Sequence, residues 1–392
     1  MLRKVVHAAT QTSHVKAIKL LAALAEVHVT REQSQRWTNR VGDERCTEVR
    51  EQAEAYHKLP LPAQQQSPSG QVPQVACVQM DGGRMQIRDR SEASQDRDEH
   101  EGFWRESLVG CCLSMTSVEH ASDPCPTIPQ TFVDPARMHK LSREIKGFSG
   151  AREAADEPPA AAPEEREGVP RVLVKSVVAT RAGVETFGKL LASEAYARGF
   201  HAARRKAFVA DGSATNWSVH AQHFSHYTPV LDFTHAICYV YAAAMAGRSG
   251  AAAWTDYCQW AQRLWSGDIE ALLAAVAARA DELGPPSPGD KTSPAAIVAR
   301  TLGYLRNQRL RMNYAAYRRL GLPITSSHIE STIKQLNRRM KGTEKFWDQG
   351  AEPILQLAAD HLSDTLALDQ FWRTRRHRLP STRRYHTTPI AA

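Results

Sequence analysis

Two short apolar runs that each stop at an aspartate constrain the fold of this chain more than any other feature. The first run, Ala207–Ala210, ends at Asp211, and the second, Pro229–Leu231, ends at Asp232. Short runs without polar residues are typical of strands buried on both faces, and α/β sheets carry their chemistry at the ends of such strands. The pattern therefore predicts buried strands with acidic residues at their ends.

Two further acidic residues belong with this pair of strands. Asp81 follows the apolar run 75–80, and Glu330 lies near the start of an amphipathic helical pattern over 327–341. Acids from separate elements suit chemistry in which carboxylates hold two divalent ions roughly 3.5–4 Å apart. We therefore expect Asp81, Asp211 and Glu330 to bind Mg²⁺ or Mn²⁺ for phosphoryl transfer on nucleic acid.

Each acid also has an ordinary structural interpretation. Asp81 and Asp211 both precede glycine, which is a strong turn signal, and Glu330 could simply complement a helix macrodipole. Asp232 is expected to cap the helix that follows it, with His235 one turn further on. We therefore expect a structural or supporting role for Asp232 and His235 beside the metal site. Only the combination of acids favours the catalytic interpretation.

The remaining patterns indicate a mixed α/β fold. A strand pattern over 75–80 ends at 81–83, and 84–87 is its continuation or a partner strand. Strand patterns over 102–115 and 171–180 come next, then a helical pattern over 184–200 and another strand over 204–210. Several strands in succession, then a helix and a further strand, predict a mixed sheet rather than a repeated βαβ array.

Composition divides the chain into regions. A stretch rich in Pro, Gln and Ser reads as a linker, and a long series of Ala- and Arg-rich helical patterns reads as an all-helical insertion before Glu330. The predicted regions are an N-terminal helical region, the linker, the first part of the core, the insertion, the last part of the core and a basic tail, at 1–58, 59–72, 73–249, 250–320, 321–370 and 371–392.

The chain is basic, and its cations cluster. Fifty Lys and Arg against 42 Asp and Glu give a formal net charge of +8, which favours a polyanionic partner such as nucleic acid. Near the N-terminus, a helical pattern over 13–27 precedes a capping box at Thr30 and Gln33. This predicts a helix-turn-helix, with an ordinary helical hairpin as the alternative. The residues predicted to contact DNA are Arg31, Arg36, Arg40, Arg306, Arg309, Arg311, Arg318, Arg319, Lys334, Arg338 and Lys341.

Neither a secretion signal nor a membrane span is predicted. Charged residues interrupt the apolar patches near the N-terminus, and these patches are too short to cross a bilayer. The seven cysteines form no C-x-x-C pair, so reduced thiols are expected. A zinc site at Cys111, Cys112, Cys125 and His120 is an alternative with unusual spacing. We expect a cytoplasmic protein associated with the nucleoid.

Several segments resemble bacterial insertion-sequence transposases of the DDE type. These are VQMDGGRMQIRDR, DPCPTIPQTFVD, ADGSATNW followed by LDFTHA, and ITSSHIESTIKQLNRRMKGTEKFWDQGAEPILQL. They are similar to the Kra-type group, which is related to the eukaryotic Mutator-like transposases. The resemblance covers most of the chain from about residue 13, and the run around Glu330 is its most specific part.

The resemblance implies an RNase H-like core with a helical insertion before the last acid. It implies a triad of Asp81, Asp211 and Glu330 that acts with Mg²⁺ or Mn²⁺. Asp232 and His235 then match the D-x-x-H element of Mutator-related enzymes, and a triad of Asp211, Asp232 and Glu330 is the alternative. The implied activity is cleavage at terminal inverted repeats in double-stranded DNA and transfer of the freed 3′-OH to target DNA, by a homo-oligomer. Two other functions share these residues: a decayed protein that only binds DNA, and an RNase H-like nuclease without strand transfer.

Overall fold

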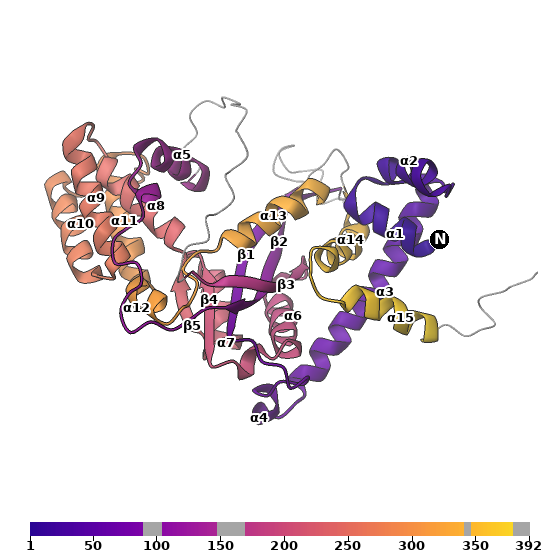
Figure 1. The fold of residues 1–392 in the computed structure, drawn as a ribbon. Coiled ribbons are helices and arrows are strands. Elements are labelled where there is room, and N and C mark those ends of the chain that lie inside the picture. The colour runs from indigo at the N-terminus through magenta and orange to yellow at the C-terminus, as the bar shows by residue number, and fades with distance from the viewer. Residues whose placement is uncertain (89–103, 147–168, 341–345, 379–392) are drawn as a thin grey trace, which may run out of the picture.

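The chain folds around a mixed sheet that has helices on both faces and at both ends (Figure 1). The computed structural model describes residues 1–88, 104–146, 169–340 and 346–378. The strands are β1 (Val75–Arg88), β2 (Trp104–Thr116), β3 (Arg171–Thr180), β4 (Arg205–Ala210), β5 (Thr228–Leu231) and β6 (Phe346–Trp347). The helices are α1 (Leu2–Gln11), α2 (His14–Ala25), α3 (Arg31–His57), α4 (Leu61–Gln64), α5 (Pro135–Lys146), α6 (Gly183–Ala197), α7 (Ala214–His223), α8 (Phe233–Met245), α9 (Ala251–Ser266), α10 (Ile269–Leu283), α11 (Pro294–Gln308), α12 (Tyr314–Arg319), α13 (Ser327–Met340), α14 (Asp348–His361) and α15 (Ala367–Arg378), with short 3-10 turns η2 (Gln130–Phe132), η3 (Phe200–Ala202) and η4 (Arg309–Arg311).

The sheet combines an antiparallel half with a parallel half. Its strand order is β3-β2-β1-β4-β5, and β6 pairs with the far end of β1. β1, β2 and β3 are antiparallel neighbours, whereas β1, β4 and β5 run parallel. A parallel pair needs a crossover, and α7 supplies the one between β4 and β5. The predicted mixed α/β fold class is confirmed.

β1 runs further than its sequence suggested. Asp81 pairs with Val109 of β2 in the middle of the β1–β2 ladder, which extends on to Gln86. Of the two expectations for 84–87, a continuation of the strand is confirmed, and a hairpin turn at 81–83 is wrong. The pairing with β2 carries the backbone straight through Gly82 and Gly83. Asp81 consequently projects from the interior of a strand.

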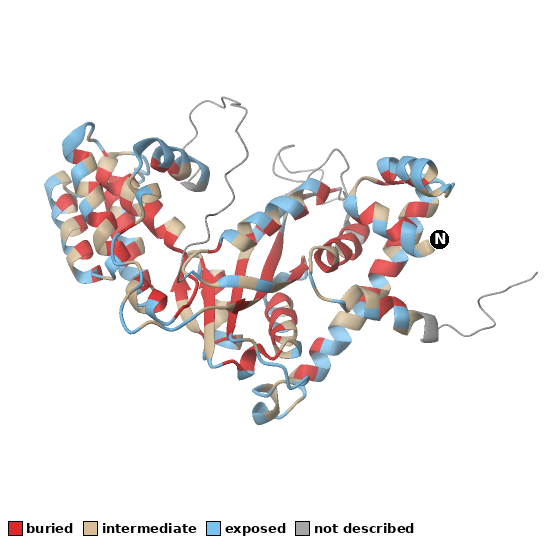
Figure 2. Ribbon diagram, viewed as in Figure 1, coloured by how far each residue is buried: buried red, intermediate tan, exposed pale blue. Residues whose placement is uncertain are grey.

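Helices cover both faces of the sheet. A Cβ atom at Gly110 of β2 would lie within 3.0 Å of Phe187 and Leu191 on α6. The next residue, Cys111, instead places its thiol 3.4 Å from the Thr332 hydroxyl on α13. Because adjacent strand residues point to opposite faces, α6 and α13 lie on opposite sides of the sheet (Figure 1). Figure 2 shows the buried residues gathered in the strands and on the helix faces that cover them.

The amphipathic helix predicted over 327–341 is α13. Its expected core residues are buried, or half-buried against the core in one case: Ile329, Leu336 and Met340, with Ile333. The cations predicted for the neighbouring stripe, Lys334 and Arg338, are exposed. The helical period read from the sequence therefore places the buried and exposed faces of α13 correctly.

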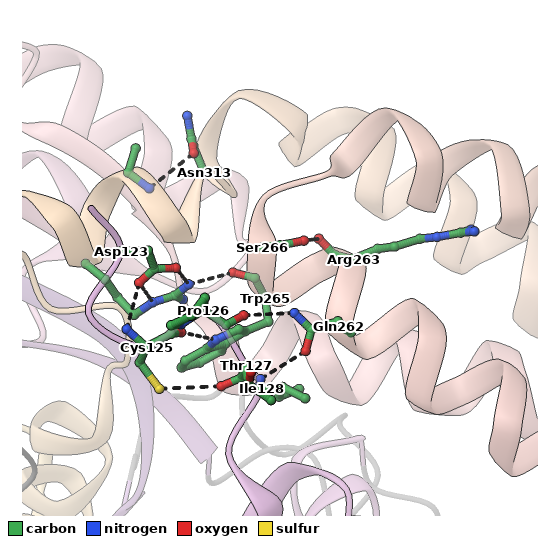
Figure 3. Close-up of polar contacts among 12 residues, drawn as sticks. Asp123, Cys125, Pro126, Thr127, Ile128, Gln262, Arg263, Trp265, Ser266 and Asn313 are labelled. Carbon is green, nitrogen blue, oxygen red and sulfur yellow. Dashed lines mark hydrogen bonds and ion pairs between the residues drawn. The ribbon is translucent and has the colours of Figure 1, made fainter. Parts of the chain in front are cut away.

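The chain between β2 and α5 fastens the helical insertion, formed by α9 to α12, to the core (Figure 3). The Trp265 indole donates to the Cys125 carbonyl oxygen at 2.6 Å. The Gln262 side chain donates to the Pro126 carbonyl oxygen at 2.9 Å and accepts from the Ile128 amide at 3.0 Å. Backbone groups of an irregular segment thus find their partners on α9, so the insertion is held in a defined place beside the sheet.

The N-terminal helices pack on the core. The predicted capping box is present, since the Thr30 hydroxyl accepts from the Gln33 amide at 3.2 Å and the Gln33 side chain accepts from the Thr30 amide at 3.0 Å. However, α3 spans 27 residues, far more than a short recognition helix. Its buried Arg45 pairs with Asp360 on α14 at 2.9 Å. This geometry favours the ordinary helical hairpin over a helix-turn-helix.

Two other boundaries differ from the expected ones. The stretch expected as a linker over 59–72 contains the short helix α4. α15 extends into the predicted basic tail as far as Arg378, and the rest of that tail lies outside the described residues. No helix in the described part of the chain is long and apolar enough to cross a bilayer.

Candidate functional site

Three aspartates continue the register of the parallel strands at one edge of the sheet. The β1–β4 ladder ends at the pair Gln79 and Val209, two residues before Asp81 and Asp211. The β4–β5 ladder ends one residue before Asp211 and Asp232. Neighbouring strands lie about 5 Å apart, so the register brings the three residues into one row. Two of them follow strand ends, as the sequence predicted.

A buried glutamine fixes the start of α13 above this row. Gln79 on β1 is fully buried, and its amide nitrogen donates to the Thr325 carbonyl oxygen at 3.0 Å. Its amide oxygen accepts from the Ile329 backbone N–H at 3.1 Å, in the first turn of the helix, and the same N–H also donates to the Ser326 carbonyl oxygen at 3.0 Å. Glu330 is the next residue, in the first turn of α13. Gln79 therefore determines where Glu330 lies relative to β1.

Asp232 holds two helices at once. It is fully buried and caps α8, because one carboxylate oxygen accepts from the His235 amide at 3.0 Å. The same oxygen lies 2.6 Å from Nδ1 of His235, and the other oxygen accepts from the Ser326 amide just before α13 at 2.9 Å. The predicted capping role is confirmed. Both oxygens are occupied in positioning α8 and α13, which leaves Asp232 little capacity to bind an ion directly.

His235 is a cation enclosed by carboxylates. Burial by itself lowers the pKa of the imidazole, but the hydrogen bond and charge of Asp232, with the charges of Asp211 and Glu330, raise the pKa to about 9. The ring is therefore protonated at neutral pH. Because Nδ1 faces Asp232, Nε2 is the nitrogen that remains for a ligand.

Glu330 completes a compact group with Asp232 and His235. One potential ligand atom from each residue lies within 4.8 Å of the other two. In the described ranges this is the one group of at least three His, Cys, Asp or Glu residues close enough to hold an ion. Burial, followed by the charge of Asp232, raises the pKa of the Glu330 carboxyl. The alternative zinc site around Cys111 does not form among these residues.

Asp81 and Asp211 belong to the same electrostatic site. Burial and then the Asp211 carboxylate raise the pKa of Asp81 to about 6, with a further upward contribution from Glu330. Asp211 is held by one oxygen, Oδ1, which accepts from the Ser213 amide at 2.9 Å and from the Asn216 side chain at 2.7 Å. This arrangement leaves Oδ2 of Asp211 as the oxygen for a ligand.

The residues at this edge fit a hard divalent cation. Asp81, Asp211 and Glu330 each offer a carboxylate oxygen, which is the type of ligand that Mg²⁺ and Mn²⁺ prefer. Burial and mutual repulsion raise the pKa of Asp81 and of Glu330, and a cation placed among them would relieve that repulsion. The donor types and their charge therefore suit the ion expected from the sequence, but the structure does not bring these three carboxylates as close together as Asp232, His235 and Glu330.

Most of the arginines and lysines predicted to bind DNA are exposed. They fall on the first half of α3, on the insertion and on α13: Arg31, Arg36 and Arg40; Arg306, Arg309 and Arg319; Lys334 and Arg338. Lys341 lies outside the described residues. Arg311 is half-buried and stacks on Trp217, with its guanidinium carbon 4.1 Å from the ring centre.

The expected phosphate contact through Arg318 is wrong. The side chain is buried, and its guanidinium pairs with the Asp123 carboxylate through Nε at 2.9 Å. It also lies 3.9 Å from the centre of the Trp265 ring and donates to the Trp265 carbonyl oxygen at 3.0 Å. Burial and pairing commit Arg318 to joining the insertion to the core, so its charge does not face solvent.

Gln79 and Asn216 are site residues that the sequence analysis missed. Asn216 is buried and orients Asp211, as Gln79 orients Glu330. The available signal for Gln79 was an amide within the otherwise apolar run VACVQM, since a polar group buried in a strand must find a hydrogen-bond partner. The sequence could not name that partner.

Comparison with known proteins identifies no family for this chain. No protein-family model matches it, and no curated protein matches it.

Proposed function

We propose that this chain is a DNA transposase that cuts the ends of an insertion sequence and joins the freed 3′-OH to target DNA. The observation that carries the proposal is that Asp81, Asp211 and Glu330, from three separate elements, share one electrostatic site. The strand order, with antiparallel β1 to β3 beside parallel β4 and β5, fits the RNase H-like core that the sequence resemblance implies. The helical insertion precedes the element that carries Glu330, as that resemblance also implies.

In this proposal each residue has a distinct task. Asp81, Asp211 and Glu330 would hold Mg²⁺ or Mn²⁺, and the chemistry such an ion would supply is activation of the attacking oxygen and neutralisation of charge on the phosphate. Asp232 orients His235 and keeps it protonated, so Nε2–H can donate to a phosphate oxygen. The same Asp232 and Gln79 position the start of α13, and therefore Glu330, before any substrate binds.

The exposed stripe of α13 provides phosphate contacts next to the acids. Lys334 and Arg338 follow Glu330 at intervals of four residues, so the three side chains lie along one face of the helix. Replacing Lys334 or Arg338 by Ala should reduce the slope of log affinity against log salt by about 1 for each residue. Fluorescence anisotropy with labelled duplex across a salt series measures that slope.

Lys189→Ala is the matched control for this experiment. Lys189 is an exposed lysine on α6, on the opposite face of the sheet, where it pairs with Glu185. The Lys189→Ala variant should leave the slope of log affinity against log salt unchanged. A similar change for Lys189→Ala and Lys334→Ala would show that overall charge, rather than the α13 face, determines DNA affinity.

Divalent cations are expected to stabilise the chain more at pH 8 than at pH 5. The raised pKa of Asp81, about 6, means that a proton occupies the carboxylate below that pH. The apparent Mn²⁺ affinity should fall about tenfold per pH unit below 6. Without ions, the stability of the fold changes with pH in the opposite direction. The native state holds this proton between pH 3.8 and about 6, so the free energy of unfolding falls as pH rises through that window.

Thermal unfolding with and without Mn²⁺, over a series of pH values, measures both effects. Asp81→Asn removes the titrating group and should abolish the pH dependence together with most of the stabilisation by Mn²⁺. An equal Mn²⁺-induced shift in Tm at pH 5 and pH 8 would be incompatible with Asp81 as a ligand.

The reaction itself is tested with duplex DNA carrying the ends of the element. These ends are found by searching the DNA that flanks the coding sequence for inverted repeats. With Mg²⁺ or Mn²⁺, the proposal expects nicking at the ends followed by joined products that contain target DNA. Nicking without joining would indicate the nuclease alternative, and binding without nicking would indicate a protein that only binds DNA.

A further inference from the structure

Tyr304 of the helical insertion lies against the residue that follows Asp211. A Cβ atom at Gly212 would lie 2.2 Å from Cε2 of the Tyr304 ring and 3.0 Å from its hydroxyl oxygen. The ring is also stacked on Tyr239 of α8, with ring centres 3.8 Å apart and planes at 12°. The ring is therefore clamped between α8 and the turn that carries Asp211, and only a glycine at 212 leaves room for it.

A second contact joins α11 to the same turn. Gln308, one helical turn beyond Tyr304, donates from its side chain to the Gly212 carbonyl oxygen at 3.3 Å. On the other side, Asn216 of α7 donates to the Asp211 carboxylate. The turn is thus held between the core helix α7 and the inserted helix α11. The insertion consequently reaches the candidate metal site through Tyr304 and Gln308.

The Tyr304 hydroxyl is buried and has no hydrogen-bond partner among the described residues. Burying an unpaired hydroxyl is unfavourable, and phenylalanine would fill the same space without this cost. Other buried tyrosines at this junction are paired: Tyr314 donates to the Leu231 carbonyl oxygen at 3.0 Å, and Tyr317 to that of Pro229 at 3.1 Å. Of these three tyrosines, the one that lies against Gly212 is the one whose hydroxyl has no partner among the described residues.

The acidic site also acts on this phenol. Burial, then the neighbouring Tyr239 ring and the charges of Asp211 and Asp232, raise the pKa of Tyr304. The backbone N–H of Gly212 acts in the opposite direction and lowers the pKa. An N–H group can use the phenolic oxygen only as an acceptor. The hydroxyl proton therefore stays on the phenol and lacks an acceptor in the ion-free state.

We propose that Tyr304 is a positioning residue for Asp211, and that its hydroxyl donates to the Asp211 carboxylate when the acidic cluster holds a divalent cation. The role rests on the proposed metal site, because the cation is what engages the Oδ2 side of Asp211. In the loaded state the unpaired donor gains a charged acceptor, and the hydrogen bond fixes the carboxylate for the ion. The insertion thus contributes directly to the metal site of the core.

Tyr304→Phe tests this role because it keeps the ring and removes only the hydroxyl. Isothermal titration with Mn²⁺ and thermal unfolding with and without Mn²⁺ give readouts that do not depend on DNA cleavage. We expect the metal-free Tm to stay the same or rise, because an unpaired buried group is lost. We expect the Mn²⁺ dissociation constant to rise about tenfold, as for loss of a hydrogen bond to a charged group.

Tyr317→Phe is the matched control with the opposite expected pattern. Its hydroxyl has a backbone partner, so this variant should lower the metal-free Tm and leave Mn²⁺ binding unchanged. If Tyr304→Phe binds Mn²⁺ like the wild type, or lowers the metal-free Tm as Tyr317→Phe does, the positioning role is overturned. If Asp211→Asn also leaves Mn²⁺ binding unchanged, the metal site itself is contradicted, and the role of Tyr304 fails with it.

Discussion

Replacing Asp211 by asparagine is expected to reduce metal-dependent DNA cleavage by well over 100-fold while leaving the fold intact. Partners that merely orient metal ligands cost about 10- to 100-fold when they are removed, so loss of a ligand should cost more. Asparagine retains a carbonyl oxygen that can still accept from the Ser213 amide and the Asn216 side chain. The substitution therefore removes the charge and one ligand oxygen without removing the contacts that hold the turn.

The measurement is single-turnover nicking of duplex DNA that carries the element ends, at saturating Mg²⁺. Asp81→Asn and Glu330→Gln should cause losses of the same order, because the three carboxylates act on one ion cluster and such effects are not additive. DNA binding should remain close to the wild-type level in all three variants. Asp256→Asn is the control, since Asp256 on α9 pairs with Arg248 just before the insertion and lies outside the cluster.

A variant with Asn at position 211 that cleaves at the wild-type rate would contradict the assignment. A loss for Glu330→Gln and Asp211→Asn without one for Asp81→Asn would instead favour the alternative triad that includes Asp232. That alternative is disfavoured geometrically, because Asp232 is fully buried and both of its oxygens accept backbone hydrogen bonds. Asp81 is only half-buried, and within the described ranges its carboxylate accepts from the Gly82 amide alone, at 2.7 Å.

Local sequence patterns predict the parallel half of the sheet well. An acidic residue follows each of two apolar runs, Ala207–Ala210 and Pro229–Leu231. Both runs lie in strands that end at the residue before the acid. The length of β1 could not be read in the same way. Its two glycines are a turn signal, but pairing with β2 overrides that local preference, and pairing over such a distance leaves no mark in the sequence.

The position of Glu330 relative to the other acids also could not be predicted from the sequence. The helical period gives its face on α13, but the place of the helix depends on Gln79, which contacts Ile329 across a separation of 250 residues. Arg318 shows the same limit. In the sequence, Arg318 and Arg319 are adjacent residues with the same charge. Only the fold shows that Asp123 and Trp265 surround Arg318, whereas Arg319 is exposed.

Replacing Asp232 by alanine is expected to destabilise the chain by about 3–5 kcal/mol at pH 7, the usual cost of removing one partner from a buried ion pair. The change leaves the His235 cation without its counter-ion and the Ser326 amide without its acceptor. It also removes the cap of α8. Urea denaturation of the variant and the wild type measures the difference in free energy of unfolding.

The size of this loss should depend on pH in a direction fixed by His235. In the wild type its folded-state pKa is raised from 6.5 to about 9, so the pair stabilises the fold fully below pH 6.5 and loses that contribution as pH rises through about 9. The destabilisation by Asp232→Ala should therefore be larger at pH 6.5 than at pH 10, and an NMR titration should show the pKa of His235 well below 9 in the variant. Asp256→Ala removes a partly exposed ion pair and should cost less than about 1 kcal/mol. A loss for Asp232→Ala that is equal at the two pH values would mean that capping alone, rather than the buried pair, is what Asp232 contributes to stability.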